Sequence, residues 1–446
     1  MLGQDRVVRD EERLERFATD ESGLGRFPPE AAALCVTAEE VRAVLAWARE
    51  RRVPVTPRGA GTGMTGGALA VRGGVVLSTE RMTRVVEIDE EDLVAVVEPG
   101  VVLGDLQAMV EERGLFYPPD PASLTSCSVG GNVAENAGGP RAFKYGVTRE
   151  YVLGLDVVLM GGETMSVGRR TSKGVTGYDV TALLVGSEGT LGVATSITLK
   201  LVPKPPAVAA MLALLPSLAV AGEAVTAVLR LGQRPRCLEL MDRASIDHVR
   251  PRAPFKIPER TAAAVMIEID GDAEALDAAL ERCAQACERA GATEVLVARD
   301  EKQRRDLWAT RRGISPALKE AHRVKIAEDV VVPRGKISAL LARVDTIAAA
   351  SRLEVATFGH AGDGNLHVNF LDDGRYSPPG RVESAVAELF RATLELGGTL
   401  SGEHGIGIAK ARYLAWEQSG ELIALQRKLK QALDPDHLLN PGKIFA

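Results

Sequence analysis

The chain has 446 residues, of which 46% are hydrophobic and 26% are charged. This composition is ordinary for a globular protein, and the length favours two or three domains over one. The formal net charge of −6 argues against a nucleic-acid partner. No apolar run approaches the roughly 20 residues that span a bilayer. The start of the chain is charged and has no apolar signal core, so we expect no export.

The five cysteines form no Cys-x-x-Cys pair. Cys283 and Cys287 lie four residues apart in a helical stretch, where small core residues are a simpler interpretation than iron–sulfur or zinc ligands. The cysteine usage favours a reduced, cytoplasmic protein. A peripheral place at the inner face of the membrane stays open.

The first half of the chain shows an α+β pattern. A capping box from Thr37 to Glu40 begins a helix in which apolar residues recur at helical spacing. Short strands rich in valine and leucine follow, separated by Gly-rich loops. These strands are expected at residues 53–56, 74–78, 93–97, 151–160 and 197–201, with a helix at 102–113.

The second half has a different texture. The paired prolines of the segment 204–208 mark a linker. Beyond it, a strand at 263–269, a helix at 273–290 and a strand at 294–298 follow a βαβ rhythm. This rhythm predicts a second sheet that is covered on one face by helices. Residues 413–433 are expected to form one helix near the C-terminus.

Three Gly-rich segments lie in the first half, at 57–67, 118–146 and 186–193. The first, PRGAGTGMTGG, follows a strand, and its glycines let the backbone expose N–H groups to a ligand, as a phosphate cradle requires. It does not run into a helix as a Rossmann motif would, and it lacks the Gly-Lys-Ser/Thr of a P-loop. Alone, it would be an ordinary multi-turn loop as easily as a binding loop. Three such segments favour a large, extended, phosphate-bearing ligand, and a dinucleotide fits better than a single phosphate.

A second constellation is centred on the stretch HAGDGNLH, residues 360–367. Two β-like runs flank a good turn sequence, which predicts a hairpin. Asn365, His367 and Asn369 share one face of the second strand, and His360 at the end of the first strand can reach toward His367. Two imidazoles with a carboxylate and open positions are a common divalent-metal arrangement. The alternative is a tight hairpin with one hydrogen-bonded histidine.

The segment LSGEHGIGIAK, residues 400–410, offers a further carboxylate and imidazole. Glu403 and His404 stand between glycines, so a tightly turned backbone presents both side chains. An isolated Glu-His pair is as easily a solvated loop. The glycine frame and the histidine hairpin together favour a functional site.

The motifs PRGAGTG, PPDPAS, SVGGNVAENAGG, KYG and GSEGTLGV stand in an order that resembles the FAD-binding domain of the vanillyl-alcohol oxidase and p-cresol methylhydroxylase superfamily. Within it, the chain is most similar to the FAD-linked D-2-hydroxy-acid dehydrogenases, which include D-lactate dehydrogenase and the flavoprotein subunit of glycolate oxidase. The resemblance implies an α+β protein. A two-subdomain FAD-binding domain would occupy 1–203, and an α+β substrate (cap) domain with an antiparallel sheet would occupy 204–403. The C-terminal helical segment, 404–446, would return to the FAD domain.

The same resemblance implies contacts with FAD. The backbone of Arg58–Gly63 would hold the pyrophosphate, and the turns Gly130–Asn132 and Asn136–Gly139 would pack against the isoalloxazine and ribityl chain. The loop that carries Glu188 would lie by the adenine. The implied FAD-binding residues are Arg58, Gly59, Ala60, Gly61, Thr62, Gly63, Pro119, Asp120, Ser123, Gly130, Gly131, Asn132, Asn136, Gly138, Gly139, Tyr145, Gly146, Glu188, Gly189, Val193 and Asn440. The first loop has no histidine for a covalent tether and Cys127 is the sole candidate in the second, so we expect dissociable FAD.

The resemblance also implies a metal site of His360, His367 and Glu403, holding a divalent ion such as Zn or Mn, with His404 as the catalytic base. A cation at this place would bind the α-hydroxyl and a carboxylate oxygen of a hydroxy acid and lower the hydroxyl pKa. A histidine that is neutral near pH 7 can take that proton. The α-hydrogen would then leave as hydride to flavin N5.

A substrate carboxylate also needs a cation. The segment 307–319 is expected to be helical up to Pro316, and the family places its carboxylate-binding arginine at the position of Arg311. A planar guanidinium suits bidentate carboxylate binding. The neighbouring Arg312 is interpreted as solvated.

Ser315 and Lys325 complete the set of substrate residues that the resemblance implies. Some relatives carry the substrate lysine closer to the acidic pair that follows, where this chain has Ala327. At the position of Lys325 this chain therefore departs from the pattern of those relatives.

Three functions fit these motifs. The first is FAD-dependent oxidation of a D-2-hydroxy acid, such as D-lactate or glycolate, to the 2-oxo acid. The alternative is a non-catalytic FAD or electron-transfer subunit of a multi-subunit glycolate oxidase, which need not keep the histidine hairpin. A third, non-redox carbon–oxygen exchange on an acyl-dihydroxyacetone phosphate, does not need the metal-type triad. Without an iron–sulfur cysteine cluster, electrons must leave through a quinone, a cytochrome, a partner protein or another acceptor. A homodimer stays open.

Overall fold

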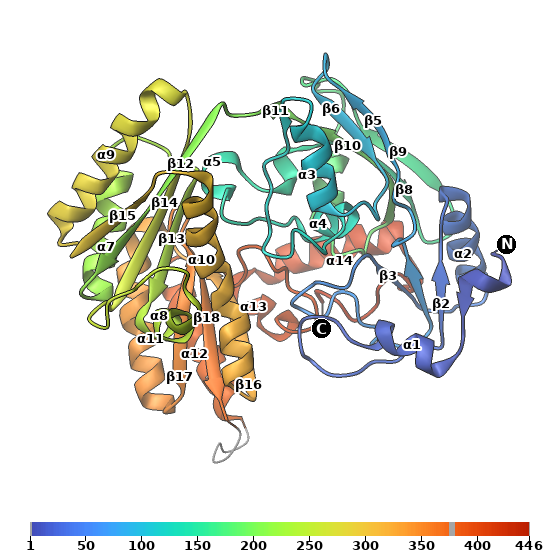
Figure 1. Cartoon of the computed structure of the whole chain (residues 1–446). Helices are drawn as coiled ribbons and strands as arrows, with labels where there is room; N and C mark the ends of the chain where they lie inside the picture. The colour runs from blue at the N-terminus through green and yellow to red at the C-terminus, as the bar shows by residue number, and fades with distance from the viewer. Residues whose placement is uncertain (1, 374–379, 446) are drawn as a thin grey trace. The chain divides into compact units, whose positions relative to one another are not determined.

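The computed structural model describes residues 2–373 and 380–445 (Figure 1). The chain divides into two compact units. The first unit is Met1–Gly138, Gly146–Lys204 and Glu403–Ala446, and the second is Gly139–Tyr145 and Pro205–Gly402. The divisions come after Lys204 and after Gly402, and the short segment Gly139–Tyr145 joins the second unit.

Side-chain bonds explain why Gly139–Tyr145 belongs to the second unit. The buried carboxylate of Asp270 forms an ion pair with Lys144 and accepts a hydrogen bond of 2.6 Å from the hydroxyl of Tyr145. The segment interrupts a Gly-rich stretch whose composition is uniform, so nothing in the sequence marks it as separate. Gly139 and Tyr145, both predicted to bind FAD, therefore belong to the second unit, whereas the other predicted FAD-binding residues belong to the first.

The first unit contains two main sheets. One has the strand order β1-β2-β4-β3, with β2 and β3 parallel to β4, and the other is antiparallel with the order β5-β6-β10-β8-β9. The strands are β1 (Val7–Val8), β2 (Ala31–Leu34), β3 (Val55–Arg58), β4 (Val75–Ser78), β5 (Val85–Asp89), β6 (Val94–Val97), β8 (Val152–Val158), β9 (Thr164–Gly168) and β10 (Val193–Lys200). Two further strands, β7 (Leu115–Phe116) and β11 (Val202–Pro203), pair with each other in an antiparallel two-stranded sheet.

The helix α2 (Ala38–Glu50) joins the two sheets through one core. Thr37 caps this helix as predicted, and its hydroxyl accepts the N–H of Glu40 at 3.3 Å. Val41, Leu45 and their apolar neighbours pack in a single buried cluster with residues of β3, β4, β8 and β10. The other helices of this unit are α1 (Glu11–Ala18), α3 (Leu103–Glu111), α4 (Val129–Glu135), α6 (Val180–Leu184), α13 (Leu414–Glu417) and α14 (Gly420–Leu433).

The single helix predicted at 413–433 is wrong, because the chain breaks between α13 and α14. Gln418 is extended, and the side chain of Ser419 accepts the N–H of Leu422 to begin a new helix. A serine within an apolar helical pattern can act as a cap, and the pattern alone did not reveal this. After α14 the chain returns to β3, where Leu439 pairs with Val55 in parallel.

A buried ion pair fixes this return. Lys430 and Asp434 are both buried, and their side chains are 2.5 Å apart. The ammonium of Lys430 also donates to the carbonyls of Thr190 and Leu439, both at 2.7 Å. Asp434 accepts the N–H groups of Leu438 at 3.1 Å and Leu439 at 2.8 Å. The pair therefore satisfies the backbone of the C-terminal turn.

The second unit is built on a seven-stranded sheet with the order β15-β12-β14-β13-β17-β18-β16, and every neighbouring pair is antiparallel. The predicted antiparallel sheet is thus confirmed. Its strands are β12 (Ala207–Leu215), β13 (Cys237–Asp242), β14 (Ala263–Gly271), β15 (Glu294–Ala298), β16 (Val324–Val331), β17 (Glu354–His360) and β18 (Asn365–Asp372). Its helices are α5 (Ala142–Tyr145), α7 (Leu218–Leu229), α8 (Arg243–Val249), α9 (Ala273–Ala290), α10 (Glu301–Ala321), α11 (Ile337–Ser351) and α12 (Arg381–Glu395).

Helices cover both faces of this sheet, so the expectation of one covered face is wrong (Figure 1). Leu212 and Leu214 of β12 pack in one cluster with Trp308 of α10. Met211 and Ala213, which alternate with them along the strand, are equally buried, and α7 and α9 also contact β12. Continuous burial along a strand is the sign of a sheet with two covered faces.

The helix α10 continues through Pro316, contrary to the expected end there. The proline removes one backbone donor. Ile314 and Leu318 on either side are fully buried in the core of the unit, and this packing outweighs the loss. Within the described residues, none of the helices has the length and apolar character that crossing a bilayer requires.

We predict that Lys430→Met destabilises the protein by about 3 kcal/mol, because it leaves the Asp434 carboxylate buried without its cation. Thermal unfolding of the FAD-loaded protein measures this loss. Lys428→Met on the same helix, where the side chain is exposed, is the control and should unfold as the wild type does. Equal unfolding midpoints for both variants would contradict the role of the pair.

Candidate functional site

The predicted histidine hairpin is confirmed by strands β17 and β18. His360 ends the first strand and is paired with Asn365, which begins the second. The turn between them needs Gly364, which has a φ of +89° and whose Cβ would lie 2.0 Å from the carbonyl oxygen of Val332. The rings of His360 and His367 lie edge to face, with centroids 5.2 Å apart. The hairpin thus brings both imidazoles together.

A buried carboxylate from the next strand lies beside this pair. Glu239 of β13 is opposite His360 in the sheet register and is fully buried. Its Oε1 is 2.6 Å from Nδ1 of His360, so the Nδ1–H group donates a hydrogen bond to the carboxylate. The neutral ring then carries its lone pair on Nε2, the state that a metal ligand requires. His360 is therefore oriented and prepared as a nitrogen donor.

The same carboxylate binds Arg311 of α10. The Nε atom and one terminal nitrogen of Arg311 lie 2.9 and 2.7 Å from Oε2 of Glu239. Burial would raise the pKa of Glu239, but its neighbours His360 and Arg311 lower it to about 2. The guanidinium also lies over the ring of Phe358, 4.6 Å from its centroid. Glu239 stays ionised and holds one member of each predicted group, metal ligand and substrate cation.

Sequence reasoning missed Glu239. It stands in the strand CLELMD, in which every residue is buried. An acidic residue within such a run must be paired, since an isolated buried charge is very costly. The acidic residue within this apolar run was the sequence signal for a buried, paired carboxylate. Only the fold identifies His360 and Arg311 as the partners of Glu239.

Two further predicted substrate residues lie together. The ammonium of Lys325 on β16 is 2.5 Å from the hydroxyl of Ser315 on α10. Burial, together with the charge of Lys319, lowers the pKa of Lys325 to about 8. Arg312 is exposed and lies over the ring of Trp308, in agreement with its interpretation as a solvated side chain.

Asp329 fixes the other side of the hairpin. It is fully buried on β16, opposite His367 in the register. Its carboxylate accepts the side-chain amide of Asn365 at 2.6 Å, and the hydroxyl of Ser401 and the N–H of Gly402 at 3.0 Å each. Gly402 is the last residue of the second unit, so this carboxylate anchors the chain directly before Glu403.

Glu403 and His404 begin the segment that belongs to the first unit. The carboxylate of Glu403 packs against Gly138, where a Cβ would lie 2.9 Å from Oε2. The imidazole Nε2 of His404 is 3.9 Å from Oε1 of Glu403. The carbonyl of His404 accepts the hydroxyl of Thr65, at 3.0 Å, from the first Gly-rich loop. Within the first unit, the predicted base therefore lies beside two predicted FAD-binding segments.

Glu188 of the third Gly-rich segment holds the same turn. Its two carboxylate oxygens accept the N–H groups of Ile406 at 2.8 Å and Gly407 at 2.6 Å. The side-chain amide of Asn440 donates to the carbonyls of Glu188 at 2.7 Å and Gly67 at 3.1 Å. The three Gly-rich segments and the C-terminal return thus meet in the first unit.

The first two Gly-rich segments also touch. A Cβ on Gly59 would lie 2.4 Å from the hydroxyl oxygen of Ser128, so this approach needs glycine. The guanidinium of Arg58 turns inward and donates to the carbonyls of Arg16 and Thr19, at 3.1 and 2.9 Å. Arg58 therefore supports the loop with its side chain, and the backbone of the loop is what it can offer to a phosphate.

These residues fit a bound FAD. The buried Nδ2 atom of Asn132, in a predicted flavin-binding turn, has no hydrogen-bond partner among the described residues. Buried donors are nearly always satisfied, so an acceptor from a bound group is expected there. Apart from Gly139 and Tyr145, every residue predicted to bind FAD belongs to the first unit.

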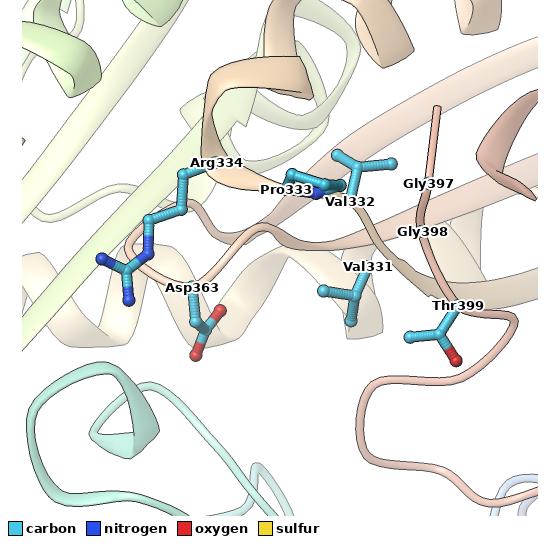
Figure 2. A pocket seen from close by; sticks show the side chains of 8 residues that line it. All are labelled: Val331, Val332, Pro333, Arg334, Asp363, Gly397, Gly398 and Thr399. Carbon is cyan, nitrogen blue, oxygen red and sulfur yellow. The ribbon is translucent and has the colours of Figure 1, made fainter. Parts of the chain in front are cut away.

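A shallow pocket of about 370 Å³ lies in the second unit. Figure 2 shows Arg334 and Asp363 at one side of it and Val331 and Thr399 at the other. Asp363 belongs to the turn between the two histidine strands, but neither histidine lines the pocket. The pocket is therefore not part of the site formed by the histidine hairpin.

Comparison with known proteins places the chain in a family. Residues 204–444 match the family of FAD linked oxidases, C-terminal domain, and residues 29–168 match the FAD binding domain. The glycolate oxidase subunit GlcD of Bacillus subtilis (strain 168) is 42% identical over 92% of this chain and 87% of its own length. The D-lactate dehydrogenase of Anaerostipes hadrus is 37% identical over 98% of this chain and 94% of its own length.

Among solved structures, p-cresol methylhydroxylase with substrate bound has a TM-score of 0.81 and 18% identity, covering 99% of this chain and 94% of that one. This likeness confirms the expected fold of the FAD-binding type. The resemblance to the FAD-linked glycolate oxidase and D-lactate dehydrogenase proteins is confirmed as well. The chain therefore belongs to the FAD-linked oxidases and carries their FAD-binding domain.

Proposed function

We propose that the protein oxidises a D-2-hydroxy acid, such as D-lactate or glycolate, to the 2-oxo acid by hydride transfer to flavin N5. The names of the two relatives, a glycolate oxidase subunit and a D-lactate dehydrogenase, support this substrate class. The observation that carries the proposal is the buried Glu239 carboxylate, which binds His360 and Arg311 at once.

His360 and His367 are proposed to hold a divalent ion, Zn or Mn, with Glu403 as the third ligand. When bound, such an ion lowers the pKa of the substrate's α-hydroxyl. Support comes from the hydrogen bond that the Nδ1–H group of His360 donates to Glu239. Because the proton is on Nδ1, the lone pair of Nε2 is available to the ion. Glu403 follows directly on Gly402, whose N–H is fixed by Asp329 opposite His367.

His404 is proposed as the base that takes the α-hydroxyl proton. A histidine suits this step, because its ordinary pKa lies near neutrality. FAD supplies the redox chemistry as the hydride acceptor. The backbone of the Arg58–Gly63 loop and the turns of the second segment would orient the cofactor, and Thr65 holds the carbonyl of His404 in the same unit.

Arg311, Ser315 and Lys325 are proposed to bind the substrate carboxylate. Glu239 and Phe358 hold Arg311 in one orientation, which reduces the entropy lost when a carboxylate binds. Lys325 and Ser315 form a second polar pair on the same two layers of the unit, α10 and the sheet.

The relative from Bacillus subtilis is named as a subunit, which favours a second candidate. The chain would then be a non-catalytic FAD or electron-transfer subunit of a multi-subunit glycolate oxidase and pass electrons to a partner protein. A quinone or a cytochrome is the other proposed acceptor. We also propose that the protein is cytoplasmic. If it is a subunit of a multi-subunit oxidase, we propose that it lies at the inner face of the membrane.

The function is tested on purified, FAD-loaded protein without oxygen. Glycolate, D-lactate, L-lactate and D-2-hydroxyglutarate are mixed with it in turn, and the flavin absorbance is followed. We expect bleaching by a D-acid or glycolate, weaker after treatment with a chelator and restored by Zn²⁺ or Mn²⁺. If no hydroxy acid reduces the flavin after metal is restored, the enzyme proposal fails and the electron-transfer candidate stands.

The base is tested by His404→Ala. Loss of the proton acceptor should slow flavin reduction about 100-fold or more, while FAD stays bound. His437→Ala is the matched control, because His437 is exposed in the same C-terminal segment. Stopped-flow reduction of both variants by the best substrate decides the point. Reduction of the His404 variant at the control's rate would exclude it as the base.

A further inference from the structure

A second group of metal-ligating side chains lies in the second unit, on elements other than the histidine hairpin turn. His248 is on α8, His322 follows the end of α10, and Glu354 is the first residue of β17. The two Nε2 atoms are 3.1 Å apart. The carboxylate oxygens of Glu354 lie 3.8 Å from Nε2 of His248 and 3.7 Å from Nε2 of His322.

These separations are close to those of a tetrahedral zinc site. Nitrogen and oxygen ligands about 2.0–2.1 Å from a zinc ion lie about 3.3 Å from one another. The three separations bracket this spacing, so the two imidazoles and the carboxylate can reach a single ion with small side-chain adjustments. Glu354 stands at a strand start and is 46% exposed, which gives its side chain the freedom to adjust.

One of the other two ring nitrogens has the hydrogen-bond partner that a metal-ligating histidine needs, and the second faces a carboxylate. Nδ1 of His248 donates to the carbonyl of Ala244 at 2.8 Å, so the neutral ring has its lone pair on Nε2. Nδ1 of His322 faces the carboxylate of Asp373 at 3.6 Å. A carbonyl or carboxylate behind the ring is the usual support for a metal-binding imidazole.

The group is separate from the proposed catalytic site. Glu354 and His360 are the first and last residues of β17. The six residue-to-residue steps of extended strand from one to the other span about 20 Å. His248 and His322 are only 19% and 12% exposed, yet the open carboxylate leaves the group accessible to an ion from solvent.

We propose that His248, His322 and Glu354 bind a second divalent transition-metal ion, for which Zn²⁺ is the best match to two imidazoles and one carboxylate. Water would fill the remaining position. Such an ion would tie α8, the end of α10 and the start of β17 together. These last two elements also carry Arg311 and His360, so the ion would stabilise the scaffold of the proposed catalytic site.

Zinc binding tests the proposal. The full-length, FAD-loaded protein carrying His360→Ala and His367→Ala is stripped with a chelator and dialysed against Zn²⁺, and its metal content is measured. We expect about one zinc per chain in this background, since one site remains. Adding His248→Gln and His322→Gln should abolish this binding and the rise in unfolding temperature that Zn²⁺ causes.

The controls separate this site from the catalytic proposal. His437→Gln in the same background should keep the zinc, because His437 is exposed elsewhere. Glu354→Gln alone, at a half-exposed position where folding is not at risk, should weaken zinc affinity at least tenfold. A background protein that binds no zinc, or that keeps it after the two glutamine changes, would overturn the proposal. Either result would leave the substrate assay unaffected.

Discussion

The buried carboxylate of Glu239 holds the polar side chains His360 and Arg311 in place within the second unit. Glu239 lies in a strand that is buried throughout, and such a charge is stable only when it is paired. Its two oxygens bind an imidazole at the end of β17 and a guanidinium on α10. Because each partner comes from a different element, the carboxylate fixes the tautomer of His360 and the orientation of Arg311 together. The chemistry proposed for both residues depends on that arrangement.

The antiparallel register explains why these residues meet. Side chains at paired positions of neighbouring strands share one face of the sheet. Glu239 is opposite His360, His360 is opposite Asn365, and Asp329 is opposite His367. Asp329 and Asn365 are joined by a hydrogen bond of 2.6 Å. A shift of one residue in any of these pairs would turn the polar groups into the opposite, apolar layer of helices.

The sequence was most informative where a local rule determines the structure. The turn chemistry of AGDGN predicted the hairpin, and period-two alternation placed His367 and Asn369 on one face. The Gly-rich segments indicated a dinucleotide, although only the resemblance named FAD. Long-range pairing was not predictable. The partners of Glu239, the attachment of Gly139–Tyr145 to Asp270, and the helix that continues through Pro316 all depend on tertiary packing that outweighs local propensity.

The most direct measurement is the metal affinity of Glu239→Gln in the FAD-loaded protein. A neutral amide keeps the shape of the side chain but cannot enforce the Nδ1 proton of His360 or offset the charge of Arg311. We predict that the ion proposed for the histidine hairpin is held about 10- to 100-fold more weakly, with a matching loss in the rate of flavin reduction. Glu288→Gln, exposed on α9, should change neither. Unchanged affinity and rate in Glu239→Gln would contradict the central role of this carboxylate.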